Sequence, residues 1–417
     1  MEVLRIAGQQ RLEGETSLGG AKNAVLPIMA ACLLIDGEII LHNVPALTDV
    51  LGMRRILELF HCSVSTDSDT LVISTKGICP GELPDELMKS MRASNLIWGP
   101  CLGRFGKSDI PLPGGCPIGV RPMDIHIKGM KALGAMVEEH HGHIISDGRH
   151  MRGTEIYLDF PSVGATENLV MAAVKTPGVT VFRNVAKEPE VVDLCCFLKE
   201  AGAKINGIGT DTLRVEGVKS LHSLEYTVIP DRIVAGTILL AAAMTRGDVT
   251  ITNVIPEHLE ALLAKMAEAG ITVEREHSSL RVHHVGAIGP VDLKTLPYPG
   301  FPTDIQPQFM TVLSVAQGTS VICESIFENR YQHCDELRRM GADIKVDGRT
   351  AIIQGSDHLD GAMVDATDLR GGAALLMAGM AAHGETLLGN ICHIDRGYCH
   401  IEKLFCHLGA DIRRVLV

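Results

Sequence analysis

Two kinds of helix alternate along the chain, and the distribution of their hydrophobic residues distinguishes them. Stretches such as Ile233–Met244 are apolar nearly all round, which predicts helices buried in the interior. The stretch Cys334–Met340 has apolar residues on one side only, which predicts a helix that faces solvent. Alternating patterns in segments such as Leu71–Ser74 and Ala351–Gln354 predict strands. The sequence therefore predicts a mixed α/β fold with buried helices.

A helix followed by a glycine and then a strand recurs along the whole chain. The glycines are Gly134, Gly202, Gly270, Gly341 and Gly409, at intervals of 68, 68, 71 and 68 residues. Each glycine suits the left-handed conformation that ends a helix. A degenerate first copy has His61 in the place of the glycine. Six copies of about seventy residues account for the chain, and each is interpreted as a β-α-β-α-β-β unit.

Six copies predict two globules of three copies each, since one core seldom serves a chain of 417 residues. The first domain is expected over residues 21–229. The second is expected over residues 1–20 plus 230–417, because the first twenty residues look like strands that complete it. The chain would then cross between the domains near Gly19–Gly20 and near Pro230.

Composition narrows the functional classes. The chain is 46% hydrophobic and 21% charged, which is typical of a folded globular protein. Its net charge of −12 and its aromatic content of 4% argue against a nucleic-acid partner. The start of the chain has no signal-peptide pattern, and Ile233–Met244 is too short to cross a bilayer. We expect a cytoplasmic protein without membrane insertion.

The twelve cysteines are scattered and form no C-x-x-C pair, so we expect mostly buried thiols in a reducing compartment. One arrangement could suggest a metal site. Cys-His pairs begin at Cys392, Cys399 and Cys406, seven residues apart. Since no acidic or cysteine partner completes the set at zinc-site spacing, we expect no metal there.

The loop from Gly114 to Pro122 presents one cysteine in a glycine- and proline-rich setting. Arg121 follows Cys116 by five residues and would favour its thiolate. The same arginine can donate two hydrogen bonds to a phosphate or carboxylate. His126, which closely follows Asp124, could pair with a thiol as a cysteine hydrolase would require, although spacing alone does not test this. The alternative is an ordinary turn that happens to contain a cysteine.

Polar residues with unusual chemistry cluster at the starts of the buried helices. Helix starts carry unpaired N–H groups and the positive dipole end, so several together would make an anion site. The candidates are Lys22, Asn23, Arg92, Ser162, Val163, Gly164, Asp231, Arg232, Asp304, Asp368 and Arg370, with Arg121, Arg330 and Arg396 elsewhere.

Each of these candidates also has a structural explanation. Asp231, Asp304 and Asp368 can be helix N-caps or first-turn acids. Arg92 and Arg370 can be surface charges. Lys22 is harder to explain in this way, because a cation at a helix start opposes the dipole.

Six motifs in order resemble the enolpyruvyl transferases. They are Gly19–Ala24, the loop Gly114–Pro122 with Asp124 and His126, Ser162–Thr166, Phe301–Asp304, Phe327–Arg330 and Asp368–Arg370. They span essentially the whole chain. The resemblance implies two similar domains, each an inside-out α/β barrel of three β-α-β-α-β-β units around buried helices. It also implies an active site in the cleft between them.

The resemblance implies a reaction as well. The enolpyruvyl group of phosphoenolpyruvate would move to the 3-hydroxyl of UDP-N-acetylglucosamine with release of phosphate, the first committed step of bacterial peptidoglycan synthesis. No metal or organic cofactor is implied. Fosfomycin is implied as a covalent inhibitor. Gly19 and Pro117 depart from the commonest family pattern, and Pro117 could stiffen the cysteine loop.

Site roles are carried over from the family by matching residues. Cys116 matches the proton donor to the methylene carbon and the site of fosfomycin or phosphoenolpyruvate adducts, and Asp304 matches the base for the sugar hydroxyl. Lys22, Arg121 and Arg396 match groups that hold phosphate and carboxylate. The remaining matches are Asn23, Arg92, Pro122, Met123, Asp124, Ile125, Ser162, Val163, Gly164 and Ile326 around the UDP-sugar, and Arg330, Asp368 and Arg370 with less certain roles.

Three alternatives remain open at this point. A transferase acting on shikimate 3-phosphate shares the fold and chemistry but lacks this cysteine loop. A non-catalytic UDP-sugar-binding paralogue is disfavoured by the joint presence of Cys116, Asp304, Lys22 and Arg396. A thiol-dependent hydrolase would need an oxyanion hole that the sequence does not show.

Overall fold

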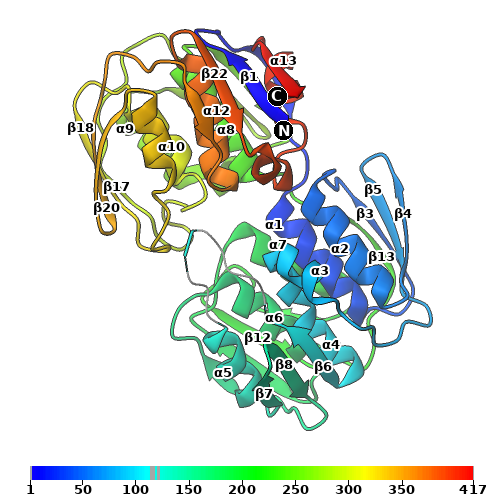
Figure 1. The fold of residues 1–417 in the computed structure, drawn as a ribbon. Coiled ribbons are helices and arrows are strands. Elements are labelled where there is room, and N and C mark those ends of the chain that lie inside the picture. The colour runs from blue at the N-terminus through cyan, green and yellow to red at the C-terminus, as the bar shows by residue number, and fades with distance from the viewer. Residues whose placement is uncertain (1, 113–117, 120–122, 417) are drawn as a thin grey trace. The chain divides into compact units, whose positions relative to one another are not determined.

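The computed structural model describes residues 2–112, 118–119 and 123–416, except for the side chains of Ser90 and Arg92. The described residues form two compact units (Figure 1). The N-terminal unit comprises most of Gly20–Ile229. The C-terminal unit comprises the strands before Gly20 and the chain from Pro230 onward, and Ile118–Gly119 groups with it. Each unit has a hydrophobic core of its own.

The N-terminal unit contains three sheets, with strand orders β13-β3-β5-β4, β6-β8-β7 and β11-β12-β10-β9. Its helical elements are α1 (Lys22–Ala31), η1 (Cys32–Leu34), α2 (Thr48–Leu59), α3 (Asp85–Ser90), η2 (Arg92–Ile97), α4 (Trp98–Phe105), α5 (Asp124–Ala132), α6 (Val163–Ala173) and α7 (Pro189–Glu200). Its strands are β3 (Glu38–His42), β4 (Ser63–Asp67), β5 (Thr70–Ser74), β6 (Lys107–Pro111), β7 (Met136–His140), β8 (His143–Asp147), β9 (Glu155–Tyr157), β10 (Val179–Arg183), β11 (Lys204–Asn206), β12 (Thr212–Glu216) and β13 (Leu224–Thr227).

The C-terminal unit also contains three sheets, with orders β21-β22-β1-β23, β15-β16-β14-β2 and β17-β18-β20-β19. Its helical elements are α8 (Arg232–Met244), η3 (Pro256–Leu259), α9 (Glu260–Glu268), α10 (Gln306–Leu313), α11 (His333–Arg339), α12 (Leu369–Ala381), η4 (Ile391–Arg396) and α13 (Ile401–His407). Its strands are β1 (Glu2–Ala7), β2 (Glu13–Ser17), β14 (Asp248–Thr252), β15 (Val273–Arg275), β16 (Ser279–His283), β17 (Leu293–Lys294), β18 (Thr319–Cys323), β19 (Asp343–Asp347), β20 (Thr350–Gln354), β21 (Met363–Asp365), β22 (Glu385–Gly389) and β23 (Ile412–Leu416).

The helices that are apolar all round lie in the interior, as the sequence predicts. In the C-terminal unit α8, α10 and α12 pack against one another (Figure 1). Every residue of α12 from Arg370 to Met380 is buried. A helix surrounded by protein has no face for solvent, which explains why its sequence lacks an amphipathic pattern. In the N-terminal unit α1 and α6 are buried in the same way.

The repeating helix ends have the predicted backbone conformation. Gly134, Gly202, Gly270, Gly341 and Gly409 have φ angles of 95°, 103°, 82°, 93° and 98°. His61, which replaces glycine in the first copy, has a φ of 65°. The left-handed conformation closes the last helical turn and directs the chain into the next strand. These angles confirm the predicted left-handed conformation at each of these six helix ends.

The N-terminal strands belong to the C-terminal unit. β1 pairs antiparallel with both β22 and β23, and β2 pairs parallel with β14. In the register Leu4 lies opposite Leu388 on one side and Arg414 on the other.

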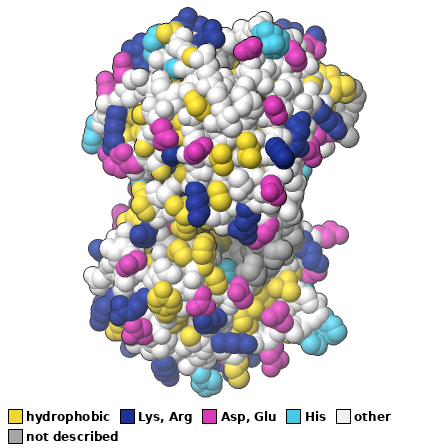
Figure 2. All heavy atoms as spheres, turned by 90° about the vertical axis from the view of Figure 1, so that its left-hand side faces the viewer, with side chains coloured by type: hydrophobic (Ala, Val, Ile, Leu, Met, Phe, Trp, Pro, Cys, Tyr) yellow, Lys and Arg dark blue, Asp and Glu magenta, His cyan; other side chains and the backbone are white. Residues whose placement is uncertain are grey.

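No helix within the described part of the chain is long and apolar enough to cross a membrane. On the face shown in Figure 2, Lys and Arg side chains are interspersed with Asp and Glu.

Candidate active site

A buried ion pair stands at the start of the first helix in the N-terminal unit. Lys22 is the first residue of α1, and its Nζ lies 2.6 Å from Asp49 Oδ2. The two side chains are only 10% and 7% exposed. Asp49 lies in the first turn of α2. The carboxylate offsets the repulsion between the ammonium and the positive end of α1, so Lys22 is held in place at a helix start. The neighbouring Asn23 is exposed.

The starts of α6 and α5 place further predicted residues in the N-terminal unit. Ser162 caps α6, and its Oγ accepts a hydrogen bond from the backbone N–H of Ala165 at 3.4 Å. Val163 and Gly164 form the half-buried first turn. A Cβ on Gly164 would lie 3.3 Å from His126 Nε2, so glycine allows α5 to approach closely. His126 is thus packed inside the unit, against the start of α6.

The start of α5 contains three residues that the resemblance assigns to the UDP-sugar. Met123 is the buried N-cap of α5, Asp124 is exposed in the first turn, and Ile125 is half-buried. Three candidates of the same segment, Cys116, Arg121 and Pro122, lie outside the described residues. Arg92 begins η2, and its side chain is likewise not among those described.

The C-terminal unit holds a carboxylate between two arginines. Asp304 Oδ2 accepts from Arg370 Nη2 at 2.9 Å and from Arg370 Nε at 3.2 Å. Asp304 Oδ1 accepts from Arg330 Nη2 at 3.2 Å. The arginine side chains are 1% (Arg330) and 4% (Arg370) exposed, whereas Asp304 is 28% exposed. The structure therefore brings together three residues that the sequence predicts separately.

The arginines of this cluster retain unused hydrogen-bonding capacity. Arg370 Nη1 and Arg330 Nε are buried and have no hydrogen-bond partner among the described residues. Burial opposes the charge of Arg370, but the neighbouring Asp304, Tyr398 and Asp231 outweigh it, and the Arg370 pKa is raised. Arg370 stays a cation. A buried cationic donor without a partner is costly, so such a group is well suited to receive an anionic ligand.

Local capping explains how Arg370 is placed. Asp368 is the N-cap of α12 and accepts from the backbone N–H groups of Arg370 and Gly371 at 2.9 and 3.2 Å. Asp231 caps α8 in the same way, accepting from Ile233 and Val234. Both are thus caps, as the structural explanation proposes. Asp304 differs, because Ile305 is the N-cap of α10 and the Asp304 side chain is directed to two arginines.

A buried histidine supports the second arginine. His333, the first residue of α11, is fully buried, and its Nδ1 lies 3.2 Å from the carbonyl oxygen of Arg330. Burial lowers the pKa of His333 to about 4, and the nearby Asp368 offsets only part of this effect. His333 is therefore neutral at physiological pH. Sequence reasoning missed it because nothing distinguishes it from the other histidines of the chain.

Glu324 is a second residue that the sequence does not reveal. It follows β18, is fully buried, and accepts hydrogen bonds from the hydroxyls of Thr295 and Thr303 at 2.9 and 3.0 Å. It also accepts from the backbone N–H of Ile326 at 2.8 Å. Glu324 thereby fixes Thr303 beside Asp304 and fixes the half-buried Ile326. The only sequence signal is an acid immediately after an apolar strand.

The last predicted cation is on the same unit. Arg396 ends η4 and is half-buried.

Of the three Cys-His pairs, Cys392-His393 lies in η4, Cys399-His400 precedes α13, and Cys406-His407 ends α13. Chemically, the C-terminal unit offers a solvent-reachable carboxylate that two cations hold in one orientation and keep ionised, and these cations can also attract an anionic ligand. The N-terminal unit offers a fixed ammonium.

Comparisons with known proteins agree with this chemistry. The family model of EPSP synthase (3-phosphoshikimate 1-carboxyvinyltransferase) matches residues 6–405. UDP-N-acetylglucosamine 1-carboxyvinyltransferase 1 of Caldanaerobacter subterraneus subsp. tengcongensis is 52% identical over 403 residues, covering 97% of each chain.

Two solved structures share the fold. The enolpyruvyl transferase NikO from Streptomyces tendae superposes with a TM-score of 0.90 at 24% identity, covering 100% of this chain and 99% of its own. EPSP synthase from Acinetobacter baumannii superposes with a TM-score of 0.79 at 17% identity, with both chains fully covered. The chain belongs to the enolpyruvyl transferase family. Within that class it belongs with the UDP-N-acetylglucosamine 1-carboxyvinyltransferases.

Proposed function

We propose that the protein transfers the enolpyruvyl group of phosphoenolpyruvate to the 3-hydroxyl of UDP-N-acetylglucosamine and releases phosphate, as an early step of peptidoglycan synthesis. The observation that carries the proposal is the Asp304 carboxylate, which is reachable from solvent and fixed by Arg330 and Arg370. The full-length identity to a protein named for this activity supplies the substrates. We place the reaction in the cytoplasm, with no metal or organic cofactor.

The proposed chemistry is an addition followed by an elimination. A proton from Cys116 reaches the methylene carbon of phosphoenolpyruvate, and the sugar 3-hydroxyl oxygen bonds to the neighbouring carbon. Asp304 accepts the proton that the hydroxyl loses. In the second stage the carbon–oxygen bond to phosphate breaks and phosphate leaves with the bonding electrons. A proton of the new methyl group returns to the Cys116 thiolate, which regenerates the thiol and the double bond on the sugar ether, and the proton on Asp304 passes to the phosphate. The sum is one transferred enolpyruvyl group and one phosphate.

The other polar residues would bind the two anionic substrates. Lys22, Arg121 and Arg396 would hold the phosphate and carboxylate of phosphoenolpyruvate, where their charge also favours departure of phosphate. The UDP-sugar would be held by Asn23, Arg92, Pro122, the α5 start (Met123, Asp124, Ile125), the α6 start (Ser162, Val163, Gly164) and Ile326. Asp368 would act indirectly, by capping the helix that carries Arg370.

We also propose a more specific fold than a mixed α/β class. We infer that the six sheets correspond to six β-α-β-α-β-β copies, three around the buried helices of each unit. Within the described residues, five of the sheets have four strands and the sixth has three. The left-handed residues at regular intervals support the same division. We further propose that residues of both units act on one pair of substrates, since Lys22 and Asp304 belong to different units.

A transferase for shikimate 3-phosphate is the principal competing function. The matching family model is described by that activity, but the solved enzyme of that name is only 17% identical, which supports a shared fold alone. The presence of Cys116 in its glycine-rich loop favours the UDP-sugar. One assay distinguishes the two functions, because phosphate release depends on which acceptor is supplied.

The decisive experiment measures phosphate release from phosphoenolpyruvate with UDP-N-acetylglucosamine, with shikimate 3-phosphate or with neither, before and after fosfomycin. We expect release only with the UDP-sugar and irreversible loss with the drug. Cys116→Ser should abolish drug labelling, whereas Cys79→Ser, which alters an exposed cysteine of the same unit, should not. Release with shikimate 3-phosphate alone would replace the proposal. UDP-sugar binding without any release would indicate a non-catalytic paralogue.

A further inference from the structure

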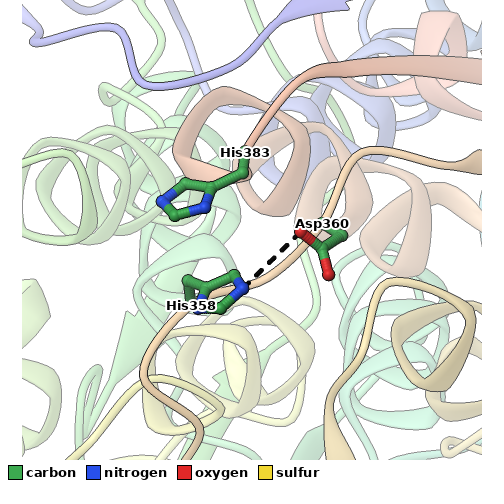
Figure 3. Close-up of side chains that lie close together, drawn as sticks. All are labelled: His358, Asp360 and His383. Atoms are coloured by element: carbon green, nitrogen blue, oxygen red, sulfur yellow. Dashed lines mark ion pairs between the residues drawn. The ribbon is translucent and has the colours of Figure 1, made fainter.

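Three metal-ligating side chains that the proposed reaction does not use lie together on the C-terminal unit. They are His358, Asp360 and His383, and all three are exposed. One ligand atom from each lies within 4.8 Å of the other two. Figure 3 shows the two imidazole rings facing each other with the carboxylate beside them. Two imidazoles and a carboxylate are a donor set that divalent transition metals favour.

The backbone holds these residues together from two distant segments. His358 and Asp360 lie between β20 and β21, and His383 follows α12. The His383 N–H donates to the Leu359 carbonyl at 2.7 Å, and the Gly361 N–H donates to the His383 carbonyl at 2.7 Å. These bonds bracket Asp360, which forms a parallel bridge with His383. Ligand binding therefore requires no rearrangement of the main chain.

A third segment anchors the carboxylate residue. The Asp360 N–H donates to the carbonyl of Met340, at the end of α11, at 2.8 Å. The side chains of His358 and Asp360, which are two residues apart in sequence, lie together. The backbone at Asp360 is thus fixed on both sides. Only the side-chain torsion angles have to change when the ion binds, and fixing them at an exposed position costs little free energy.

The side chains lie close together, but at least one imidazole ring has to rotate before they can bind one ion, because the nitrogen lone pairs of two stacked rings do not meet at one point. His358 Nε2 lies 3.6 Å from Asp360 Oδ1. The His358 and His383 rings are nearly parallel, with centroids 4.4 Å apart and planes inclined by 14°. Tetrahedral ligands at ordinary bond lengths are about 3.3 Å apart, so the His358–Asp360 pair needs to approach by about 0.3 Å and no pair by more than about 1.5 Å. Rotation about the side-chain torsions can supply this movement.

The surrounding charge also favours a cation. His383 follows α12 by two residues, so it lies at the negative end of a 13-residue helix dipole. Asp360 adds a full negative charge. By contrast, Arg370 lies at the opposite end of α12, about 20 Å away by the helical rise. A metal ion at the histidines would consequently act independently of the Asp304 cluster.

We propose that His358, Asp360 and His383 form a surface site for one divalent transition-metal ion, with water in the remaining coordination positions. The class is set by the donors, since imidazole nitrogen suits Zn²⁺, Co²⁺ and Ni²⁺, whereas Mg²⁺ and Ca²⁺ prefer oxygen. The bound ion links the β20–β21 connection to the end of α12. Its role is to stabilise the C-terminal unit, and it takes no part in the proposed transfer.

The test uses Co²⁺ and the full-length protein, first freed of metal by chelation. Co²⁺ is chosen because exposed cysteines such as Cys392 and Cys399 also bind soft metals. Thiolate-bound Co²⁺ absorbs strongly in the near ultraviolet, whereas a histidine–carboxylate site shows only weak visible bands. Titrations compare wild type with His383→Ala and with the isosteric Asp360→Asn. His277→Ala, another exposed histidine of the same unit, is the control.

We expect wild type to bind one more Co²⁺ than His383→Ala, without thiolate absorption. Affinity should fall at least tenfold in both site variants and stay unchanged in His277→Ala. A hundredfold excess of Mg²⁺ should not compete, because Mg²⁺ prefers oxygen ligands. Phosphate release by His383→Ala should equal wild type. Equal Co²⁺ binding by wild type and His383→Ala, or a site spectrum dominated by thiolate, would overturn the proposal.

Discussion

Arg370 donates from both Nε and Nη2 to the same oxygen of Asp304, at 3.2 and 2.9 Å. The other oxygen of Asp304 faces Arg330 Nη2 at 3.2 Å. The carboxylate is therefore fixed at both oxygens by two cations that are almost completely buried. Its 28% exposure is the route by which a substrate hydroxyl can reach it. If Asp304 accepts the substrate proton as we propose, its orientation for that step depends on the guanidinium group of Arg370.

The first prediction concerns the two donors, Nε and Nη2, that Arg370 directs to Asp304. Arg370→Lys keeps the positive charge but replaces a planar two-donor group by a single ammonium, which cannot hold Asp304 in the same orientation. We expect kcat for phosphate release to fall by about a hundredfold, the size of effect that small misplacements produce. Arg338→Lys, on the outer helix α11, is the matched control and should keep wild-type kinetics. A kcat within twofold of wild type would show that these two donors are not needed.

The second prediction removes the carboxylate that we propose as the base. Asp304→Asn has the same shape but accepts a proton poorly, so kcat should fall by about 10²- to 10⁴-fold. Binding of UDP-N-acetylglucosamine, measured by calorimetry, should stay within a few-fold of wild type. Asp335→Asn, at an exposed position of α11, is the control. If Asp304→Asn turned over normally, the proton would have to leave by another group.

The sequence predicted the helices that build this site better than the roles of the individual residues in it. Interior helices and left-handed helix ends follow from local rules, and the structure confirms them at Gly134, Gly341 and the other copies. Asp231, Asp304 and Asp368 could not be separated in the sequence, because each precedes a buried helix. Only tertiary contacts show that two are caps and that Asp304 pairs with arginines.

Glu324 and His333 could not be predicted at all, for a related physical reason. Their importance comes from burial beside groups on other elements, such as Thr295 and Thr303 for Glu324. A single sequence does not record which polar residues the fold will bury. Cys116 and Arg121, which carried much of the sequence argument, lie outside the described residues, and their roles stay predictions.

The third prediction concerns the buried pair of Lys22 and Asp49. Asp49→Ala leaves an ammonium buried without its carboxylate, which should lower the free energy of unfolding by about 3–5 kcal/mol. Replacing both residues by apolar ones should recover part of that loss. Glu58→Ala is the control in the same helix, since its pair with Arg54 is at least one-third exposed on both sides and contributes only about 0.3–0.5 kcal/mol.

The measurement for this pair is urea unfolding followed by circular dichroism. The midpoint should shift clearly for Asp49→Ala and barely for Glu58→Ala. Because Lys22 is also proposed to hold phosphoenolpyruvate, Asp49→Ala should raise KM for that substrate more than for the UDP-sugar. Equal stability of the two variants would mean that other contacts of Lys22 compensate for the missing carboxylate.

The last prediction is a pH dependence that originates at His333. Burial lowers the pKa of His333 in the folded protein to about 4, whereas an unfolded histidine has a pKa of about 6.5. Between these values the unfolded chain binds a proton that the folded chain does not. The contribution of His333 is thus fully present above pH 6.5 and is lost as the pH falls toward 4, up to about 3 kcal/mol in all.

Replacing the histidine isolates this contribution. His333→Asn retains a donor for the Arg330 carbonyl but does not titrate, so its unfolding free energy should decline less between pH 7 and pH 5 than that of wild type. Wild type should lose up to about 1.4 kcal/mol per pH unit more than the variant across that interval. His277→Asn, at an exposed position, should follow wild type. Parallel curves for wild type and His333→Asn would mean that the folded protein protonates His333 as readily as the unfolded chain does, and the burial argument would fail.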